Sequence, residues 1–98
     1  MTAALSRDAL KRLDVARRTA AGIEAVAELA DLLGADGAGR WAVAGELSRR
    51  LGLFESTAYP RIARGSRKPR GRVEELLAAI CSAPKLPRSR ERIYDLIR

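Results

Sequence analysis

The residues with the clearest chemistry are six basic side chains between positions 61 and 72, in a stretch that contains no acid. They are Arg61, Arg64, Arg67, Lys68, Arg70 and Arg72. Arginine and lysine bind phosphate oxygens, and a dense cluster of them is typical of a nucleic-acid-binding surface. A basic loop that only keeps the protein soluble is the alternative interpretation of the same residues.

The other reactive residue types leave little room for catalysis. The chain has no histidine and a single cysteine, Cys81, which excludes His-based triads, Cys–His dyads, an intrachain disulfide and the usual Cys/His zinc sites. Glu24, Glu28, Glu74 and Glu75 are interpreted as solvated helix charges. The glycine-rich segment 34–39, GADGAG, lacks the lysine of a phosphate-binding loop. We therefore expect no enzyme, no cofactor, no metal site and no small-molecule ligand.

Charge is unevenly distributed along the 98 residues, which carry a net charge of +7. Residues 1–39 hold five Lys/Arg and six Asp/Glu, whereas residues 40–98 hold fourteen and six. A chain of this length forms one domain with a modest core. It has no apolar run long enough to span a membrane and no signal-peptide pattern. We therefore expect a cytoplasmic protein of a bacterial or phage-infected cell that binds no membrane.

Two short helices are predicted to position the basic residues. Leu47 and Leu51 share an apolar face, and Gly52 is predicted to end this first helix. The second helix is expected to begin at Ser56 or Thr57, whose hydroxyl would cap its first turn. Pro60 then falls in that first turn, and the residue before it, Tyr59, is expected to avoid helical angles.

The segments LSRRLGL, EST and RIARGSRKPR, within residues 40–81, resemble the lambda-repressor-like (xenobiotic-response-element) regulators. The resemblance implies an all-α domain of five or six helices whose helix-turn-helix places a recognition helix in the DNA major groove. It also implies a homodimer on a two-fold operator. Three features depart from the family pattern: one additional residue between Gly52 and Ile62, Ala44 where many members carry a glutamine, and Pro60.

These patterns predict a repressor-like transcriptional regulator that binds double-stranded DNA sequence-specifically. The side chains expected to contact bases are Ser56, Thr57 and Arg61, with Arg61 the principal one. Those expected to contact the DNA backbone are Arg64, Arg67, Lys68, Arg70 and Arg72. Two alternatives remain open: a small adaptor, antitoxin or phage protein that binds a host protein, and a general nucleic-acid-binding protein.

The remaining helices are predicted from apolar spacing. Two stripes in the N-terminal third differ in direction by roughly 110°, at 100° per residue, which predicts a break between Thr19 and Gly22. Residues 1–18 are then a helical extension, either a dimer element or a loosely held arm, and residues 19–98 the DNA-binding domain. A helix is expected to end at Gly34, and others to cover residues 73–82 and 88–97. The candidate dimer interface comprises Ile93, Leu96 and Ile97, or Leu10 and Leu13.

Overall fold

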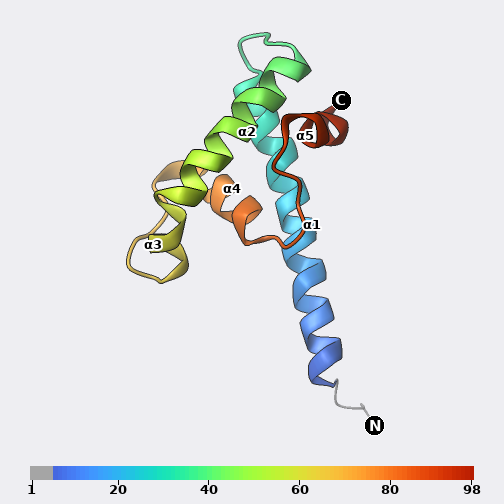
Figure 1. The fold of residues 1–98 in the computed structure, drawn as a ribbon, viewed down its shortest axis with the longest axis vertical. Helices are drawn as coiled ribbons and strands as arrows, with labels where there is room; N and C mark the ends of the chain where they lie inside the picture. Colours follow the sequence, from blue (N-terminus) through green and yellow to red (C-terminus); the bar gives the residue numbers. More distant parts are fainter. Residues whose placement is uncertain (1–5) are drawn as a thin grey trace.

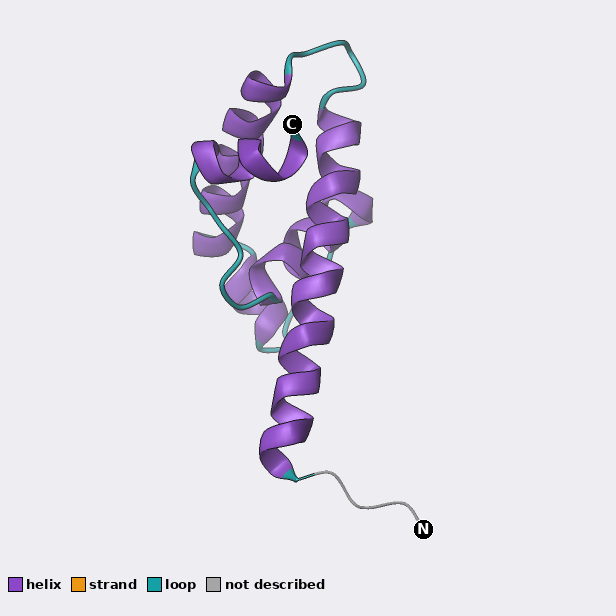
Figure 2. Ribbon diagram, turned by 90° about the vertical axis from the view of Figure 1, so that its right-hand side faces the viewer, coloured by secondary structure: helices purple, strands orange, loops and turns teal. Residues whose placement is uncertain are grey.

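The computed structural model describes residues 6–98, which form five helices and no strand (Figures 1 and 2). The helices are α1 (Arg7–Leu33), α2 (Arg40–Ser56), α3 (Tyr59–Ala63), α4 (Gly71–Ser82) and α5 (Arg90–Ile97). The prediction of an all-helical chain is confirmed over this range. Residues 1–5 of the predicted N-terminal extension lie outside the described residues.

The core forms where α1, α2, α4 and α5 meet. Its largest completely enclosed side chains are Leu29, Leu47, Leu51, Ile80 and Ile93. Helix α4 packs mainly against α1, and α5 packs mainly against α2. Each buried leucine or isoleucine contributes roughly 1.5–3 kcal/mol, so apolar burial is the main stabilising term. Helix α3 contributes no fully buried residue and lies at the edge of this core.

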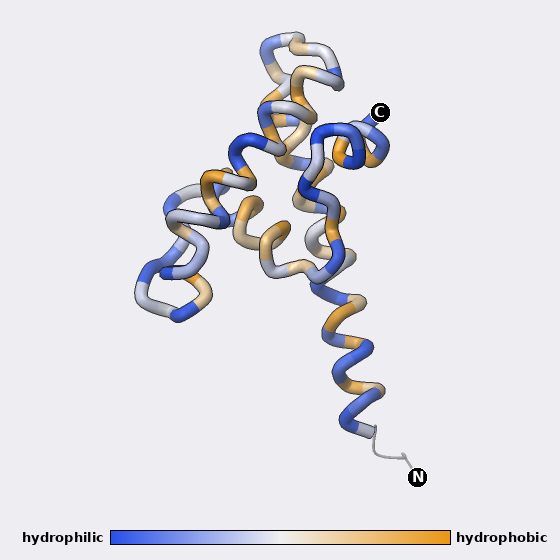
Figure 3. The backbone as a smooth tube through the Cα atoms, viewed as in Figure 1, coloured by the Kyte–Doolittle hydropathy of each residue, from blue (hydrophilic) through white to orange (hydrophobic). Residues whose placement is uncertain are grey.

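Helix α1 is continuous, so the predicted break between Thr19 and Gly22 is wrong. Only its C-terminal half is buried, beginning at Gly22. The N-terminal half projects from the body as an arm that carries both apolar and polar residues (Figures 1 and 3). Leu10 and Leu13 stay exposed on the arm, whereas the buried residues between Gly22 and Ala30 form the face of α1 that packs on the core.

Gly22 is needed for close packing within the helix. A Cβ atom there would lie 2.4 Å from Leu86 Cδ1 and 2.7 Å from Ala83 Cβ. The glycine therefore lets the segment between α4 and α5 lie directly on α1. Close approach of another chain segment is one of the established uses of glycine.

The C-terminal ends of three predicted helices agree with the structure. Gly34 follows the last residue of α1, with its N–H donating to the Ala30 carbonyl at 2.9 Å. Helix α4 ends at Ser82 as predicted. The predicted C-terminal helix is α5, whose first turn is capped by Ser89. No helix among the described residues has the length and apolar character needed to cross a membrane.

Two of the residues predicted for a dimer interface belong to the core. Ile93 is completely buried and Ile97 is 8% exposed, because both face α1 and α2 from α5. They are therefore removed as interface candidates. Leu96, on the outer side of α5, and Leu10 and Leu13, on the projecting arm, are 45%, 52% and 45% exposed.

Candidate nucleic-acid interface

The basic stretch predicted to bind phosphate lies on one side of the molecule. Helix α3 and the loop that joins it to α4 protrude beside the C-terminal end of α2 (Figure 1). The loop turns at Gly65 and Gly71, whose φ angles of 77° and 85° lie in the left-handed region that favours glycine. Ser66 closes the loop onto α3, since its backbone N–H and its hydroxyl both donate to the Arg61 carbonyl at 3.0 Å. The backbone of the loop is thus defined by its own hydrogen bonds.

The predicted turn at Gly52 is wrong, because α2 continues through this residue to Ser56. Leu47, Leu51 and Phe54 are all buried, so one core-facing stripe spans the glycine. Burial of a phenylalanine contributes roughly 1.5–3 kcal/mol, which exceeds the cost of about 1 kcal/mol for glycine in a helix interior. Helix α2 therefore ends one turn later than the resemblance implies.

Ser56 and Thr57 do not cap the helix that follows, so this prediction is wrong as well. The Ser56 hydroxyl donates to the carbonyls of Gly52 and Leu53 at 3.1 Å, and the Thr57 hydroxyl donates to Leu53 at 2.7 Å. Both side chains thus satisfy carbonyl groups at the end of α2. The Leu53 carbonyl also accepts the Thr57 backbone N–H at 3.1 Å, so the hydroxyls add further hydrogen bonds in the last turn of α2, as serine and threonine side chains in helices often do.

Helix α3 is only five residues long and begins at Tyr59. Pro60 lies in its first turn, as predicted, where the missing N–H costs nothing. The expectation that Tyr59 avoids helical angles is wrong. Its ring packs against Phe54, with ring centroids 6.3 Å apart, and this contact offsets the restriction that proline places on the preceding residue.

The structure brings together the three residues predicted to contact bases. Ser56, Thr57 and Arg61 line one open hollow of about 470 Å³, together with Ala58 and Arg67. All three predicted residues are exposed. The end of α2 and the short α3 therefore present one polar, cationic surface, although the two helices differ from the predicted pair in length.

Arg67 forms an ion pair that fastens the loop to α4. Its Nη2 donates to both carboxylate oxygens of Glu74, at 2.8 and 3.0 Å, and the two side chains are only 17% and 26% exposed. The Arg70 backbone N–H also donates to Glu74, at 2.9 Å. The hydrogen bond from this N–H, and to a lesser extent those from Arg67, lowers the Glu74 pKa below its ordinary value. Glu74 thus neutralises the Arg67 charge within the fold, so Arg67 is poorly placed to bind a phosphate.

Arg72 is also paired within the protein, and it faces α1. It donates to Glu28 at 2.5 and 2.7 Å and to Glu75 at 3.3 Å. The hydrogen bonds from Arg72 lower the Glu28 pKa, and those carboxylates raise the Arg72 pKa. Its placement connects α4 to α1. Arg67 and Arg72, both predicted to contact the DNA backbone, are therefore paired with carboxylates within the protein.

The remaining four basic residues keep exposed side chains that form no ion pair among residues 6–98. We call them the basic tip: Arg61, Arg64, Lys68 and Arg70. They come from α3 and the loop after it, a segment that contains no carboxylate. The tip thus concentrates four positive charges, none of which forms an ion pair among residues 6–98.

Glu74 and Glu28 were interpreted from sequence as solvated helix charges. This is wrong for Glu74, which is 26% exposed and bonded to the loop, whereas Glu28 is 44% exposed but also pairs with Arg72. Glu74 lies in the first turn of α4, where a carboxylate can accept the N–H of the residue that precedes the helix. An acid at such a position after a cationic loop is a signal that sequence analysis could have used. No comparable local signal predicts the Glu28–Arg72 pair, because it joins residues 44 positions apart.

Cys81 lies at the edge of the core. Its side chain is half-buried against the core, and burial raises the pKa of the thiol to about 11. The thiol therefore stays protonated at neutral pH, which disfavours a nucleophilic role.

Comparisons with known proteins identify no relative: no protein-family model, no curated protein and no solved structure matches the chain.

Proposed function

We propose that this protein binds double-stranded DNA sequence-specifically and regulates transcription, as its resemblance to lambda-repressor-like regulators implies. The observation that carries the proposal is the basic tip, in which four exposed cations lack ion-pair partners among the described residues. Duplex DNA presents about one negative charge per 1.7 Å of its axis, so unpaired cations at a protruding end match its chemistry.

The order of elements also supports a lambda-repressor-like arrangement. Helices α2 and α3 are followed by the basic loop and by α4, in the order that the family motif implies. The long α2 and the five-residue α3 depart from that motif. In this proposal the surface that enters the groove therefore consists of the end of α2 together with α3.

The four cations divide into one base contact and three phosphate contacts. Arg61 is the member of the tip that lies within α3 and lines the hollow shared with Ser56 and Thr57. Its guanidinium can bond O6 and N7 of guanine together, which is worth roughly 1–3 kcal/mol of discrimination. Arg64, Lys68 and Arg70 follow on the loop and bind the DNA backbone.

The proposal is tested by fluorescence anisotropy with two labelled duplexes, one containing the DNA upstream of the gene and one of scrambled sequence, at several salt concentrations. Lys68→Ala/Arg70→Ala should weaken binding to both duplexes. It should also lower the slope of log K against log salt by about two, because each phosphate contact contributes about 0.9. The matched control is Arg7→Ala/Lys11→Ala, which removes the same charges from the arm.

Arg61→Ala should weaken binding to the upstream duplex roughly 5- to 150-fold and leave the scrambled duplex unaffected. An equal loss on both duplexes would make Arg61 a phosphate contact. If the arm variant loses as much affinity as the tip variant, the basic tip is not the DNA-binding surface. Absence of duplex binding by the unaltered protein at low salt would remove the proposal itself.

A further inference from the structure

Helix α1 carries an apolar stripe that the core does not use. Its members recur with alternating spacings of four and three residues, which is the seven-residue repeat of a coiled coil. They are Ala9, Leu13, Ala16, Ala20, Ile23 and Ala27. Leu13 and Ile23 are 45% and 46% exposed, and the alanines at 16, 20 and 27 are exposed. The stripe thus extends from the arm onto the packed half of the helix while remaining open to solvent.

Charge along α1 is polarised. Residues 7–18 hold five Lys/Arg and two Asp/Glu, net +3, whereas residues 19–33 hold three acids and no base, net −3. A second α1 that runs antiparallel would place each positive half against a negative half. A parallel partner would place like charges together. The stripe and the charge pattern therefore favour the same occupant, a second copy of this chain in the antiparallel direction.

We propose that the protein self-associates through antiparallel pairing of two α1 helices along this stripe. A register centred between Ala20 and Ile23 pairs the four central members of the stripe, with Ala20 opposite Ile23 of the second copy and Ala16 opposite Ala27 of the second copy. Alanine at most layers allows the helix axes to approach to roughly 8 Å, the short end of the usual range. The inference does not depend on DNA binding.

In this register we expect two ion pairs between the copies, one on each side of the seam where the two stripes meet. Arg17 and Glu24 lie on the same flank of the stripe, seven residues apart, and neither has an ion-pair partner among residues 6–98. Antiparallel pairing brings Arg17 of each copy to Glu24 of the other. Charged residues that flank a coiled-coil seam determine partner choice and orientation in this way.

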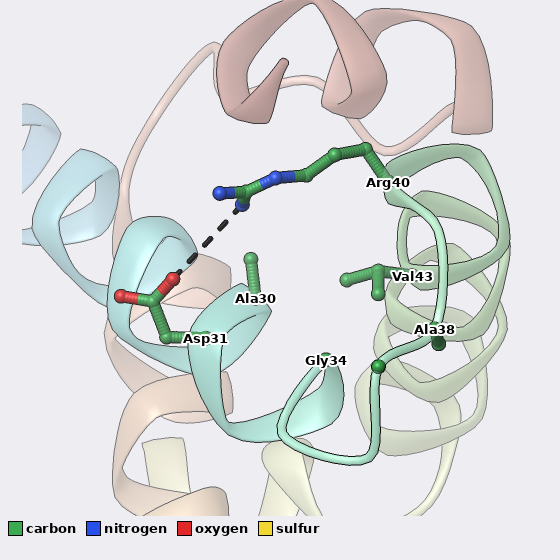
Figure 4. A pocket seen from close by; sticks show the side chains of 7 residues that line it. Ala30, Asp31, Gly34, Ala38, Arg40 and Val43 are labelled. Carbon is green, nitrogen blue, oxygen red and sulfur yellow. Dashed lines mark ion pairs between the residues drawn. The ribbon is translucent and has the colours of Figure 1, made fainter.

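A hollow at the end of the stripe supports the same register. It has a volume of about 250 Å³ and lies between α1 and the start of α2. Figure 4 shows Ala30 and Val43 pointing into it and the Asp31–Arg40 ion pair, at 4.0 Å, beside it. Leu13 of the second copy falls opposite Ala30, so this exposed leucine would meet the hollow.

Sedimentation velocity on the full chain, from 1 to 100 μM and without DNA, tests the proposal. The unaltered protein should form a dimer, and Ala20→Glu should weaken it at least tenfold because two carboxylates would enter the seam. The matched control is Ala21→Glu, one residue along the same helix and away from the stripe, which should dimerise normally. Both positions are exposed, and circular dichroism checks that both variants stay folded.

Orientation is tested with Arg17→Glu and Glu24→Arg. Each variant alone places like charges opposite each other and should dimerise about tenfold more weakly. In an equimolar mixture the charges are opposite again, and dimerisation should be as strong as that of the unaltered protein. A mixture that does not recover contradicts antiparallel pairing. A monomer at 100 μM, or equal behaviour of the Ala20 and Ala21 variants, overturns the interface. None of these outcomes affects the DNA-binding test, so the two proposals fail separately.

Discussion

The middle of α1 and the last third of α2 each contain a glycine within an apolar helical pattern, and the structure uses the two glycines differently. Gly22 is buried where the segment between α4 and α5 crosses α1. Gly52 is exposed, and a Cβ there would meet no atom within 4 Å. Both helices continue through their glycine. Gly22 is therefore a packing requirement, whereas Gly52 is tolerated because the residues around it are buried.

The strongest test of this comparison is Phe54→Ala. Phe54 is 6% exposed and is the core residue that follows Gly52 in α2. Its truncation should lower the free energy of unfolding by about 3 kcal/mol and shorten α2 at its C-terminal end. Urea unfolding followed by circular dichroism measures the first effect, and amide hydrogen exchange at residues 52–56 measures the second. Leu53→Ala is the control, since Leu53 is 58% exposed and its loss should cost less than about 0.5 kcal/mol.

Gly22→Ala should be the next largest change. The new methyl group would overlap Leu86 and Ala83, so we expect a loss of about 1–3 kcal/mol in unfolding free energy. The double variant Gly22→Ala/Leu86→Ala should lose less than the sum of its two single variants, because removal of the leucine side chain relieves the closest contact. Additive losses in urea unfolding would mean that Gly22 does not serve close packing.

Gly52→Ala should change stability in the opposite direction. Alanine in an open helix interior is favoured over glycine by roughly 0.5–1 kcal/mol, so the urea midpoint should rise with an unchanged slope. If this position were a left-handed turn, as the lambda-repressor-like motif implies, Gly52→Ala would lower the stability instead. The sign of the change therefore distinguishes the continuous α2 from a conventional helix-turn-helix.

The sequence predicted the fold well where one apolar stripe determines one helix. The bounds of α4 and α5 follow from Leu76, Leu77 and Ile80 and from Ile93 and Ile97, all of which are buried. The predictions at Gly22 and Gly52 failed because tertiary contacts keep each helix continuous, those of Leu86 on Gly22 and those of the core on Phe54. Leu86 lies on Gly22 although the two are more than sixty positions apart in the sequence.

The candidate site was predictable as a cluster and not as individual contacts. A run of basic residues without acids locates the positive surface, and four of its six members keep exposed side chains without an ion pair in the described part of the chain. The sequence could not show that Arg72 pairs with Glu28, because that contact depends on how α4 packs against α1. It also could not assign Ser56 to the end of α2, because a serine hydroxyl can serve either end of a helix.

The smallest expected effect is that of Ser56→Ala, which tests where α2 ends. As the cap of a following helix, Ser56 would contribute about 1 kcal/mol. In the structure its hydroxyl instead bonds back to Gly52 and Leu53 within the last turn of α2, and alanine has the higher helix propensity. We therefore expect a change within about 0.5 kcal/mol in urea unfolding. A loss near the full capping value would place a helix start at Ser56, and α3 would then be long enough to act as the recognition helix that the sequence predicts.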